Sequence, residues 1–186
     1  RGEFLPYYYI HNMNLQGNYI ILHDTVIVNK DVDLELKYSE NVKFLWTTTD
    51  AQGNNEMNDI ISFFKLINYS DELINFYRKI KKSGFKMCFG GMSIINSNYL
   101  KTIFEYYNCS ESLNAFIDSR YKRTLFERII AILFYHYSNI NNVMIVNGDI
   151  IKYKMNNRHV NIENYKKSKE NMIKIFLSRE NKLQKN

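Results

Sequence analysis

The sequence predicts an α/β fold, a mixed, mostly parallel sheet flanked by helices. The first observation is a continuous apolar run of strand length at residues 19–28, rich in β-branched residues. Such runs are typical of strands buried on both faces of a parallel sheet. The second is that strand-like segments alternate with segments whose apolar residues recur at helical spacing, as in α/β proteins. At 186 residues, the chain is long enough for one domain with a substantial core.

Local signals support each element in turn. Pro6 leads a short aromatic helix, Ser70 is an N-cap candidate for a helix that ends at Gly84, and Asn96 or Ser97 caps the next one. The expected strands are 19–28, 42–48, 85–95 and 143–146. The expected helices are Leu5–Asn12, 57–68, Ser70–Ser83, a segment from Asn96 or Ser97 to about Tyr107, a short helix capped by Ser110, and the most apolar helix, 122–138.

Composition and charge indicate which ligands and which cellular compartment to expect. The net charge of +6 fits an anionic ligand, nucleic acid or an anionic membrane surface equally well. Cys88 and Cys109 lack metal-ligand spacing, so we expect reduced, half-buried thiols in a cytoplasmic protein. No apolar run is long enough to span a bilayer, and no signal-peptide pattern is visible. The chain begins at Arg1 without a methionine, which fits a piece of a longer protein.

His23-Asp24-Thr25 interrupts the apolar run at 19–28. A carboxylate buried in a sheet is costly unless it is paired, and ligands in α/β sheets bind at the C-terminal strand ends. Asp24 is therefore a candidate contact for a metal or a phosphate. The alternative is a strand that ends at Leu22, with Asp24 solvated in a turn, and the segment alone does not separate the two.

Two further segments contain candidate binding or catalytic residues. Gly90-Gly91 lies in the strand expected at 85–95, where a glycine pair indicates either a simple bulge or the close approach of another group, such as a sugar or a phosphate. Arg120 and Arg123 begin the apolar helix, and cations there are explained if an anion binds beside them. Glu127, where this helix turns apolar, is a candidate general acid or base with a raised pKa. Its alternative is a surface ion pair with a neighbouring arginine.

Two histidines have distinct contexts. His136, among aromatic residues of the apolar helix, is expected to be a hydrogen-bonded core or rim residue rather than a ligand. His159 follows Arg158 in a polar loop and could reach a phosphate. The chain lacks a P-loop, a nucleophile elbow and a GxGxxG fingerprint.

The combination of motifs resembles the catalytic half of a GT-A-fold glycosyltransferase, over about residues 6–146, and is most similar to family-2-like sugar transferases. The similar parts are the strand ending in His-Asp-Thr, the Cys-Phe-Gly-Gly-Met-Ser-Ile-Ile segment and Phe-Glu-Arg-Ile-Ile-Ala. The resemblance implies that Asp24, in a His-Asp-Thr motif that replaces Asp-x-Asp, faces a divalent cation (Mn or Mg) and the donor diphosphate. It places Glu127 as the base that activates the acceptor hydroxyl. The resemblance also implies that His23 and Thr25 of this motif bind the donor or its phosphates and that Gly90 and Gly91 line the sugar pocket. Arg120, Arg123 or His159 could hold phosphate.

The sequence departs from this family in two ways. Val26 stands where a second aspartate would be expected, so metal binding would rely on one carboxylate and substrate phosphates. Only one short helix precedes the motif strand, so the N-terminal nucleotide-binding strands of the family are missing from this sequence. We therefore expect residues 1–160 to be a portion of a catalytic domain and residues 161–186 to be a charged C-terminal helix.

The resemblance implies sugar transfer from a nucleotide-sugar donor to a glycan or other hydroxyl acceptor, with inversion if Glu127 lies opposite the leaving group. Two alternatives stay open. One is a basic module that binds single-stranded nucleic acid by stacking, although the tyrosines lie mostly in apolar, core-like runs. The other is a degenerate transferase-like domain without a donor site. Homo-oligomer formation is also left open by the sequence.

Overall fold

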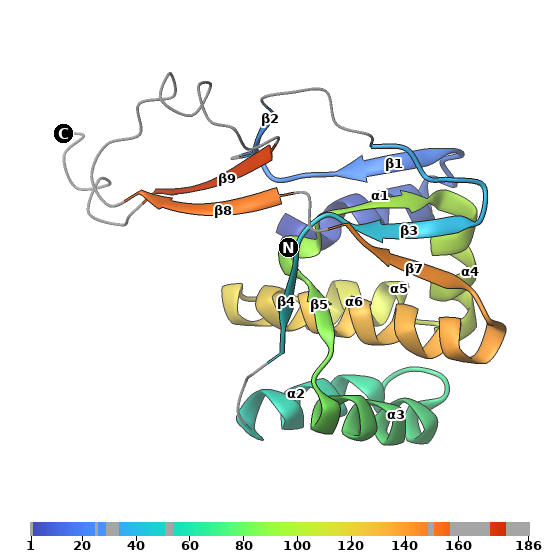
Figure 1. Cartoon of the computed structure of the whole chain (residues 1–186). Coiled ribbons are helices and arrows are strands. Elements are labelled where there is room, and N and C mark those ends of the chain that lie inside the picture. Colours follow the sequence, from blue (N-terminus) through green and yellow to red (C-terminus); the bar gives the residue numbers. More distant parts are fainter. Residues whose placement is uncertain are drawn as a thin grey trace.

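The computed structural model describes residues 2–24, 26–28, 34–50, 54–148, 151–156 and 172–177. It is an α/β structure in which a mixed sheet is flanked by helices (Figure 1). The described helical segments are η1 (Gly2–Phe4), α1 (Leu5–Asn12), α2 (Asn54–Phe64), α3 (Ser70–Ser83), η2 (Phe89–Gly91), α4 (Ser97–Tyr107), α5 (Ser110–Phe116) and α6 (Arg120–Asn141). The described strands are β1 (Asn18–Ile21), β2 (Val26–Val28), β3 (Glu40–Phe44), β4 (Thr47–Thr49), β5 (Lys86–Cys88), β6 (Ser93–Asn96), β7 (Met144–Asn147), β8 (Ile151–Asn156) and β9 (Met172–Leu177).

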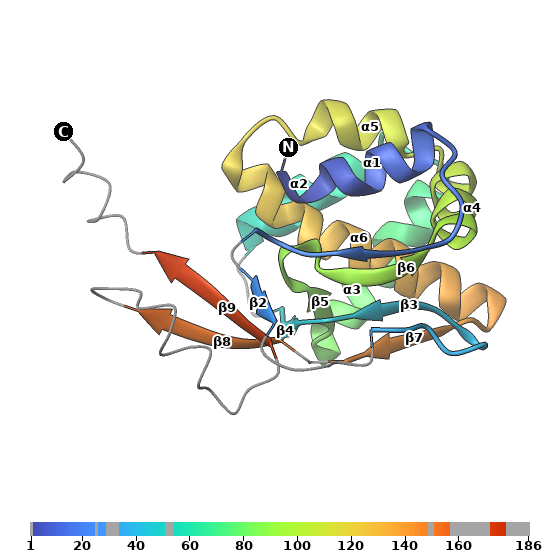
Figure 2. The same ribbon diagram turned by 90° about the horizontal axis from the view of Figure 1, so that it is seen from above.

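The central sheet has four strands in the order β1-β6-β3-β7. β6 runs antiparallel to both of its neighbours, and β3 and β7 are parallel. A second sheet, β2-β9-β8, projects to one side of the body, while β4 and β5 form an antiparallel pair near α6 (Figure 2). Four of the six described strand pairs are thus antiparallel. The sheet is mixed as expected, but the expectation of mostly parallel strands is wrong, because β6 lies between β1 and β3 and runs antiparallel to both.

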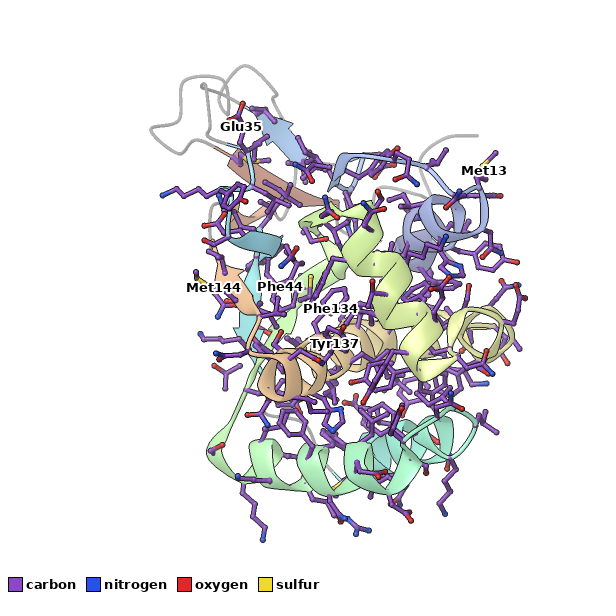
Figure 3. The ribbon with its side chains drawn as sticks, turned by 90° about the vertical axis from the view of Figure 1, so that its right-hand side faces the viewer. Met13, Glu35, Phe44, Phe134, Tyr137 and Met144 are labelled. Atoms are coloured by element: carbon purple, nitrogen blue, oxygen red, sulfur yellow. The ribbon has the colours of Figure 1, made fainter. Side chains whose placement is uncertain are left out.

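Helix α6 is the centre of the core. It lies between the central sheet and the pair α2–α3 (Figure 1). On its sheet side Phe134 packs on Phe44 of β3, with ring centroids 6.1 Å apart (Figure 3). The apolar pattern of residues 122–138 predicts that four side chains bury this helix, and all four are fully enclosed. They are Leu125, Ile129, Ile132 and Leu133.

Each of the three long strands expected from the sequence is divided between two sheets. The run at 19–28 ends its first strand at Ile21 and resumes in the second sheet at Val26. Its first part is an edge strand in which only Ile21 is buried, so burial on both faces is also wrong. The physical cause is the polar pair His23-Asp24, which leaves the ladder and turns the chain toward the cleft described below.

The other two divisions surround a smaller second core. The segment 42–48 breaks at Leu45-Trp46, and 85–95 breaks at the turn η2. Leu45, Trp46 and Ile94 are buried on the face of the sheet away from α6, together with Met172 of β9. The breaks therefore bury apolar side chains that a continuous strand would place elsewhere.

The charged helix expected at 161–186 is contradicted at Met172–Leu177, which forms strand β9. β9 pairs antiparallel with β2 and parallel with β8. Its Met-Ile-Lys-Ile-Phe-Leu sequence is rich in strand-forming residues, and Met172 is fully buried. The rest of 161–186, and the domain boundary expected at 160, lie outside the described residues.

Candidate active site

Two adjoining cavities open between η1, the loop after β1 and the first turns of α6. The first has a volume of about 350 Å³ and includes Asp24 in its wall. The second, also of about 350 Å³, includes Glu127. Glu3, His23 and Arg123 line both cavities. These three side chains therefore separate two halves of one cleft, which we call the Asp24 half and the Glu127 half.

Asp24 lies in a turn after the end of β1 and is exposed. Both sequence interpretations describe part of this arrangement. The strand ends before Asp24, as in the solvated-turn interpretation, but the residue also lines the Asp24 half of the cleft beside His23. A carboxylate there is positioned to contact a ligand.

His23 is fixed against the glycine turn η2. Its Nε2 lies 2.8 Å from the carbonyl oxygen of Gly90, a hydrogen bond in which the imidazole N–H donates. A Cβ added to Gly90 would come within 2.6 Å of the His23 ring, and Gly90 has φ +63°. The glycine therefore permits both a left-handed turn and the close approach of the ring. A group does approach Gly90 closely, but it is the protein's own imidazole and not a sugar or a phosphate.

Gly91 is enclosed by protein on the other side of the turn. It has φ +64°, and its carbonyl accepts a hydrogen bond of 2.7 Å from the Tyr7 hydroxyl. Both glycines are buried, and neither lines the two halves of the cleft. The pair shapes the cleft through His23 and Tyr7, whereas the sequence interpretation had it line the sugar pocket directly.

Glu127 combines burial with access to the cleft. Only 8% of the residue is exposed, and this burial raises the pKa of its carboxyl to about 7. A hydrogen bond from the backbone amide of Gly90 and the charge of Arg128 act in the lowering direction, and Glu3 raises it further. The surface ion pair considered from the sequence does not describe this residue. A carboxyl that titrates near neutrality can exchange a proton at physiological pH.

Two cations lie at the cleft, both from the first turn of α6. Arg120 is exposed and lines the Glu127 half. Arg123 Nη1 lies 3.6 Å from Glu3 Oε2, with about a third of its side chain exposed. The N-cap Ser119 accepts a hydrogen bond from the Lys122 amide and starts the helix there. This start places both arginines on the turn that borders the cleft.

Glu3 was not identified from the sequence. It is one charged residue in a short turn, and no periodicity or motif distinguishes it. Its place becomes visible only when η1 packs on α6, where Oε1 lies 4.0 Å from His23 Nε2 and Oε2 faces Arg123. Phe4 anchors this turn by packing its ring 5.5 Å from that of Phe126.

The cleft offers few side chains that could bind a metal ion. Among the described residues, no group of three or more acidic, imidazole or thiol side chains is arranged to hold an ion. Asp24 offers one exposed carboxylate, which suffices for Mg²⁺ only when substrate phosphates and water complete the coordination. The described residues therefore fit a metal brought in with a nucleotide and do not form a metal site of their own.

The other candidates lie elsewhere or outside the described residues. Thr25 and His159 are in the latter group. His136 is buried, and its Nδ1 lies 2.7 Å from the Tyr107 hydroxyl, so its expected role as a hydrogen-bonded core residue is confirmed. Burial lowers the pKa of His136. Cys88 and Cys109 are free thiols, as expected, but both are fully buried and not half-buried.

A buried ion network surrounds Arg128, the residue that follows Glu127 in α6. Arg128 Nε binds Asp50 Oδ1 at 3.0 Å, and Lys81 Nζ binds Asp50 Oδ2 at 3.2 Å. Glu56 Oε2 is 3.5 Å from Arg128 Nη2. Arg128 is 2% exposed and Asp50 7%. The network turns Arg128 away from Glu127 and joins the end of β4 to α2, α3 and α6.

A larger cavity, of about 500 Å³, lies between α3, β5 and α6. Its walls include Phe76, Ile80 and Tyr135 with Lys79 and Lys86, and they hold neither a carboxylate nor an imidazole. Histidine and carboxyl side chains are the most frequent general acids and bases at neutral pH, and the smaller cleft contains both. The smaller cleft with Glu127 is therefore the candidate active site.

Comparison of the chain with known protein families, with curated proteins and with solved structures gives no match in any of the three. Among the helices that the structure describes, none has the length and apolar character needed to cross a membrane.

Proposed function

We propose that this chain carries the catalytic part of a glycosyltransferase, which moves a sugar from a nucleotide-sugar donor to an acceptor hydroxyl. The observation that supports it most is Glu127, a buried carboxyl with a pKa near 7 in the wall of a cleft that also holds Asp24, His23 and two arginines. The reaction class, sugar transfer, is inferred from the resemblance of the sequence motifs to those of GT-A-fold glycosyltransferases.

The residues divide the reaction between the two halves of the cleft. In the Glu127 half, ionised Glu127 accepts the proton of the acceptor hydroxyl as that oxygen attacks the anomeric carbon. The bond from this carbon to the donor diphosphate breaks, and the leaving diphosphate gains negative charge. Arg123, which lines both halves, stabilises this charge, since an arginine fork matches phosphate oxygens, and Arg120 adds positive charge from the Glu127 half. If the acceptor enters from the side of Glu127 and the diphosphate leaves on the opposite side, the anomeric configuration inverts.

Asp24 is proposed to contact the donor. A divalent cation bound with the nucleotide would supply further charge stabilisation for the leaving group, and Asp24 is the residue that would hold it. His23 forms the adjoining wall, and its hydrogen bond to Gly90 keeps the ring in place.

The test begins with binding. Nucleoside diphosphates and nucleotide sugars are screened by the shift in melting temperature, with and without manganese, against wild-type protein and Asp24→Ala. We expect stabilisation by at least one nucleotide sugar, since a ligand that binds only the folded state raises its stability. Asp24→Ala is expected to lose both this shift and sugar transfer while keeping its own melting temperature.

The outcomes separate the alternatives. Stabilisation by neither nucleotides, nucleotide sugars nor oligonucleotides would favour the degenerate domain, which has no donor site. Stabilisation by oligonucleotides but by no nucleotide sugar, with loss at higher salt, would favour the nucleic-acid module. In either case the proposed transfer activity would be rejected.

A further inference from the structure

The ion pair between Glu3 and Arg123 stands between the two halves of the cleft. Both residues line each half, and their side chains are 21% and 32% exposed. A ligand that contacts Asp24 in one half and reaches Glu127 in the other must pass this pair. In the proposed reaction the donor phosphates lie beside Asp24, whereas the anomeric carbon must meet the acceptor oxygen beside Glu127. Both belong to one donor molecule, which therefore spans the two halves.

The ion pair is poorly formed. Its 3.6 Å separation is longer than a hydrogen bond, and Glu3 Oε2 is buried without a hydrogen-bond partner among the described residues. A buried acceptor left unpaired is unfavourable. Phosphate oxygens, in contrast, accept two parallel hydrogen bonds from one guanidinium. Arg123 is therefore held by a weak internal partner where a stronger external one would fit.

The backbone that carries Glu3 is anchored, while its carboxylate is not. Phe4 is fully buried against Phe126, and a Cβ added to Gly2 would lie 3.0 Å from Arg123 Nη1. Turn η1 thus packs closely on the arginine through its backbone. Rotation of the Glu3 side chain is the smallest movement that frees Arg123 and joins the two halves.

We propose that Glu3 is an internal competitor for an anion at Arg123: a bound diphosphate displaces its carboxylate and opens the Asp24 half to the Glu127 half. That the anion is the diphosphate of a nucleotide sugar rests on the proposed function. The competition rests only on the geometry of Glu3, Arg123 and the cleft.

The test measures the binding of inorganic pyrophosphate by calorimetry, without metal. Glu3→Gln keeps the side-chain shape and removes its charge, so we expect pyrophosphate to bind about fivefold more tightly, the effect of removing one partly exposed competing ion pair. Arg123→Gln is expected to weaken binding by about tenfold. In the double variant, Glu3→Gln should give no gain, because the cation for which the carboxylate competes is absent.

Glu105→Gln is the matched control, because it makes the same charge change on an exposed α4 residue whose ion-pair partner is Lys101. It accounts for the general attraction of a basic protein for anions. Glu3→Ala provides a second variant should Glu3→Gln fold poorly. The proposal is overturned if neither Glu3 variant binds more tightly than Glu105→Gln, or if the gain persists without Arg123.

Failure of this proposal is distinguishable from failure of the proposed function. Tighter pyrophosphate binding in Glu3→Gln, without transfer of any sugar, would establish the competition and reject the transferase. Sugar transfer by wild type, with unchanged pyrophosphate binding in Glu3→Gln, would support the transferase and reject the competition.

Discussion

Glu127 owes its properties to its position at the edge of the core. It is the residue before Arg128, yet the two side chains have different partners, since Arg128 binds Asp50 and Glu56 in the buried network. Glu127 faces the Gly90 amide and the cleft. Among the described residues its carboxyl has no close ion-pair partner, and burial of an unpaired acid raises its pKa.

The raised pKa predicts a pH dependence of stability. The carboxyl of Glu127 has an ordinary pKa of 4.5 when unfolded and about 7 when folded. Between these values the folded state binds more protons than the unfolded state, so the free energy of unfolding falls as pH rises from about 4.5 to 7 and then levels off. Glu127→Gln removes this titration. Urea unfolding at pH 5 and pH 8 should show the variant gaining about 3 kcal/mol on wild type between the two pH values, since one pKa unit is about 1.4 kcal/mol. An equal difference at both pH values would mean that Glu127 titrates normally.

Gly90 provides a second prediction at this scale. Gly90→Ala would place a methyl group 2.6 Å from the His23 ring and should cost about 1–3 kcal/mol in stability, with displacement of the ring. Gly17→Ala is the control, since Gly17 also has positive φ, at +122°, but no atom within 4 Å of an added Cβ. Denaturant unfolding measures the cost, and the NMR shifts of the His23 ring report its position. Undisturbed His23 signals in Gly90→Ala would contradict the geometry described here.

At the scale of elements, the Asp50–Arg128 network joins β4, α2, α3 and α6. Asp50→Asn leaves a buried arginine with a weakened partner and is expected to lower the free energy of unfolding by about 3 kcal/mol, as does Arg128→Met. The double variant should lose less than the sum of the two, because neither charge is then left unpaired. A surface change, Asp118→Asn in the exposed pair with Lys122, should have little effect. Strict additivity in the double variant would show that the two residues do not stabilise each other.

The elements differ in how well local sequence predicts them. Asn96 caps α4 as expected, accepting hydrogen bonds from the amides of Asn98 and Tyr99, because a cap depends on a few adjacent residues. Ser70, by contrast, is the first residue of α3, and its expected capping place is taken by Tyr69 with φ +61°. Tyr69 stacks on Tyr106 of α4, with ring centroids 4.3 Å apart. This long-range contact is absent from the local sequence pattern.

The three long apolar runs were correctly predicted to be extended, but their division between sheets was not predicted, and strands β8 and β9 were missed. An apolar run of β-branched residues indicates an extended segment, and β1, β3 and β6 do share one sheet. Where each run would leave that sheet depends on tertiary packing, such as the second core around Trp46 and Met172. A one-dimensional pattern does not contain this information, so each run was read as one strand when it forms two.

At the scale of the whole molecule, the cleft joins segments that are far apart in the chain. His23 and Asp24, the turn at Gly90 and the start of α6 at Arg120 meet there, and the sequence interpretation identified each of them from its local chemistry. Glu3 was not identified from the sequence, because a single glutamate can be recognised as a cleft residue only from the residues that pack around it. Candidate site residues could thus be predicted where a sequence motif contains them. The residues that complete the wall of the cleft could not be predicted, because tertiary packing brings them there.

The most direct test is the rate of sugar transfer by wild type, Glu127→Gln and the control Glu105→Gln, with the donor identified by the binding screen. We expect wild type and the control to transfer sugar at similar rates. Glu127→Gln keeps the shape of the side chain and removes the base, so its turnover should fall by about a hundredfold or more, with little change in donor affinity. Normal turnover by Glu127→Gln, or no transfer by wild type from any nucleotide sugar that binds, would contradict the proposed function.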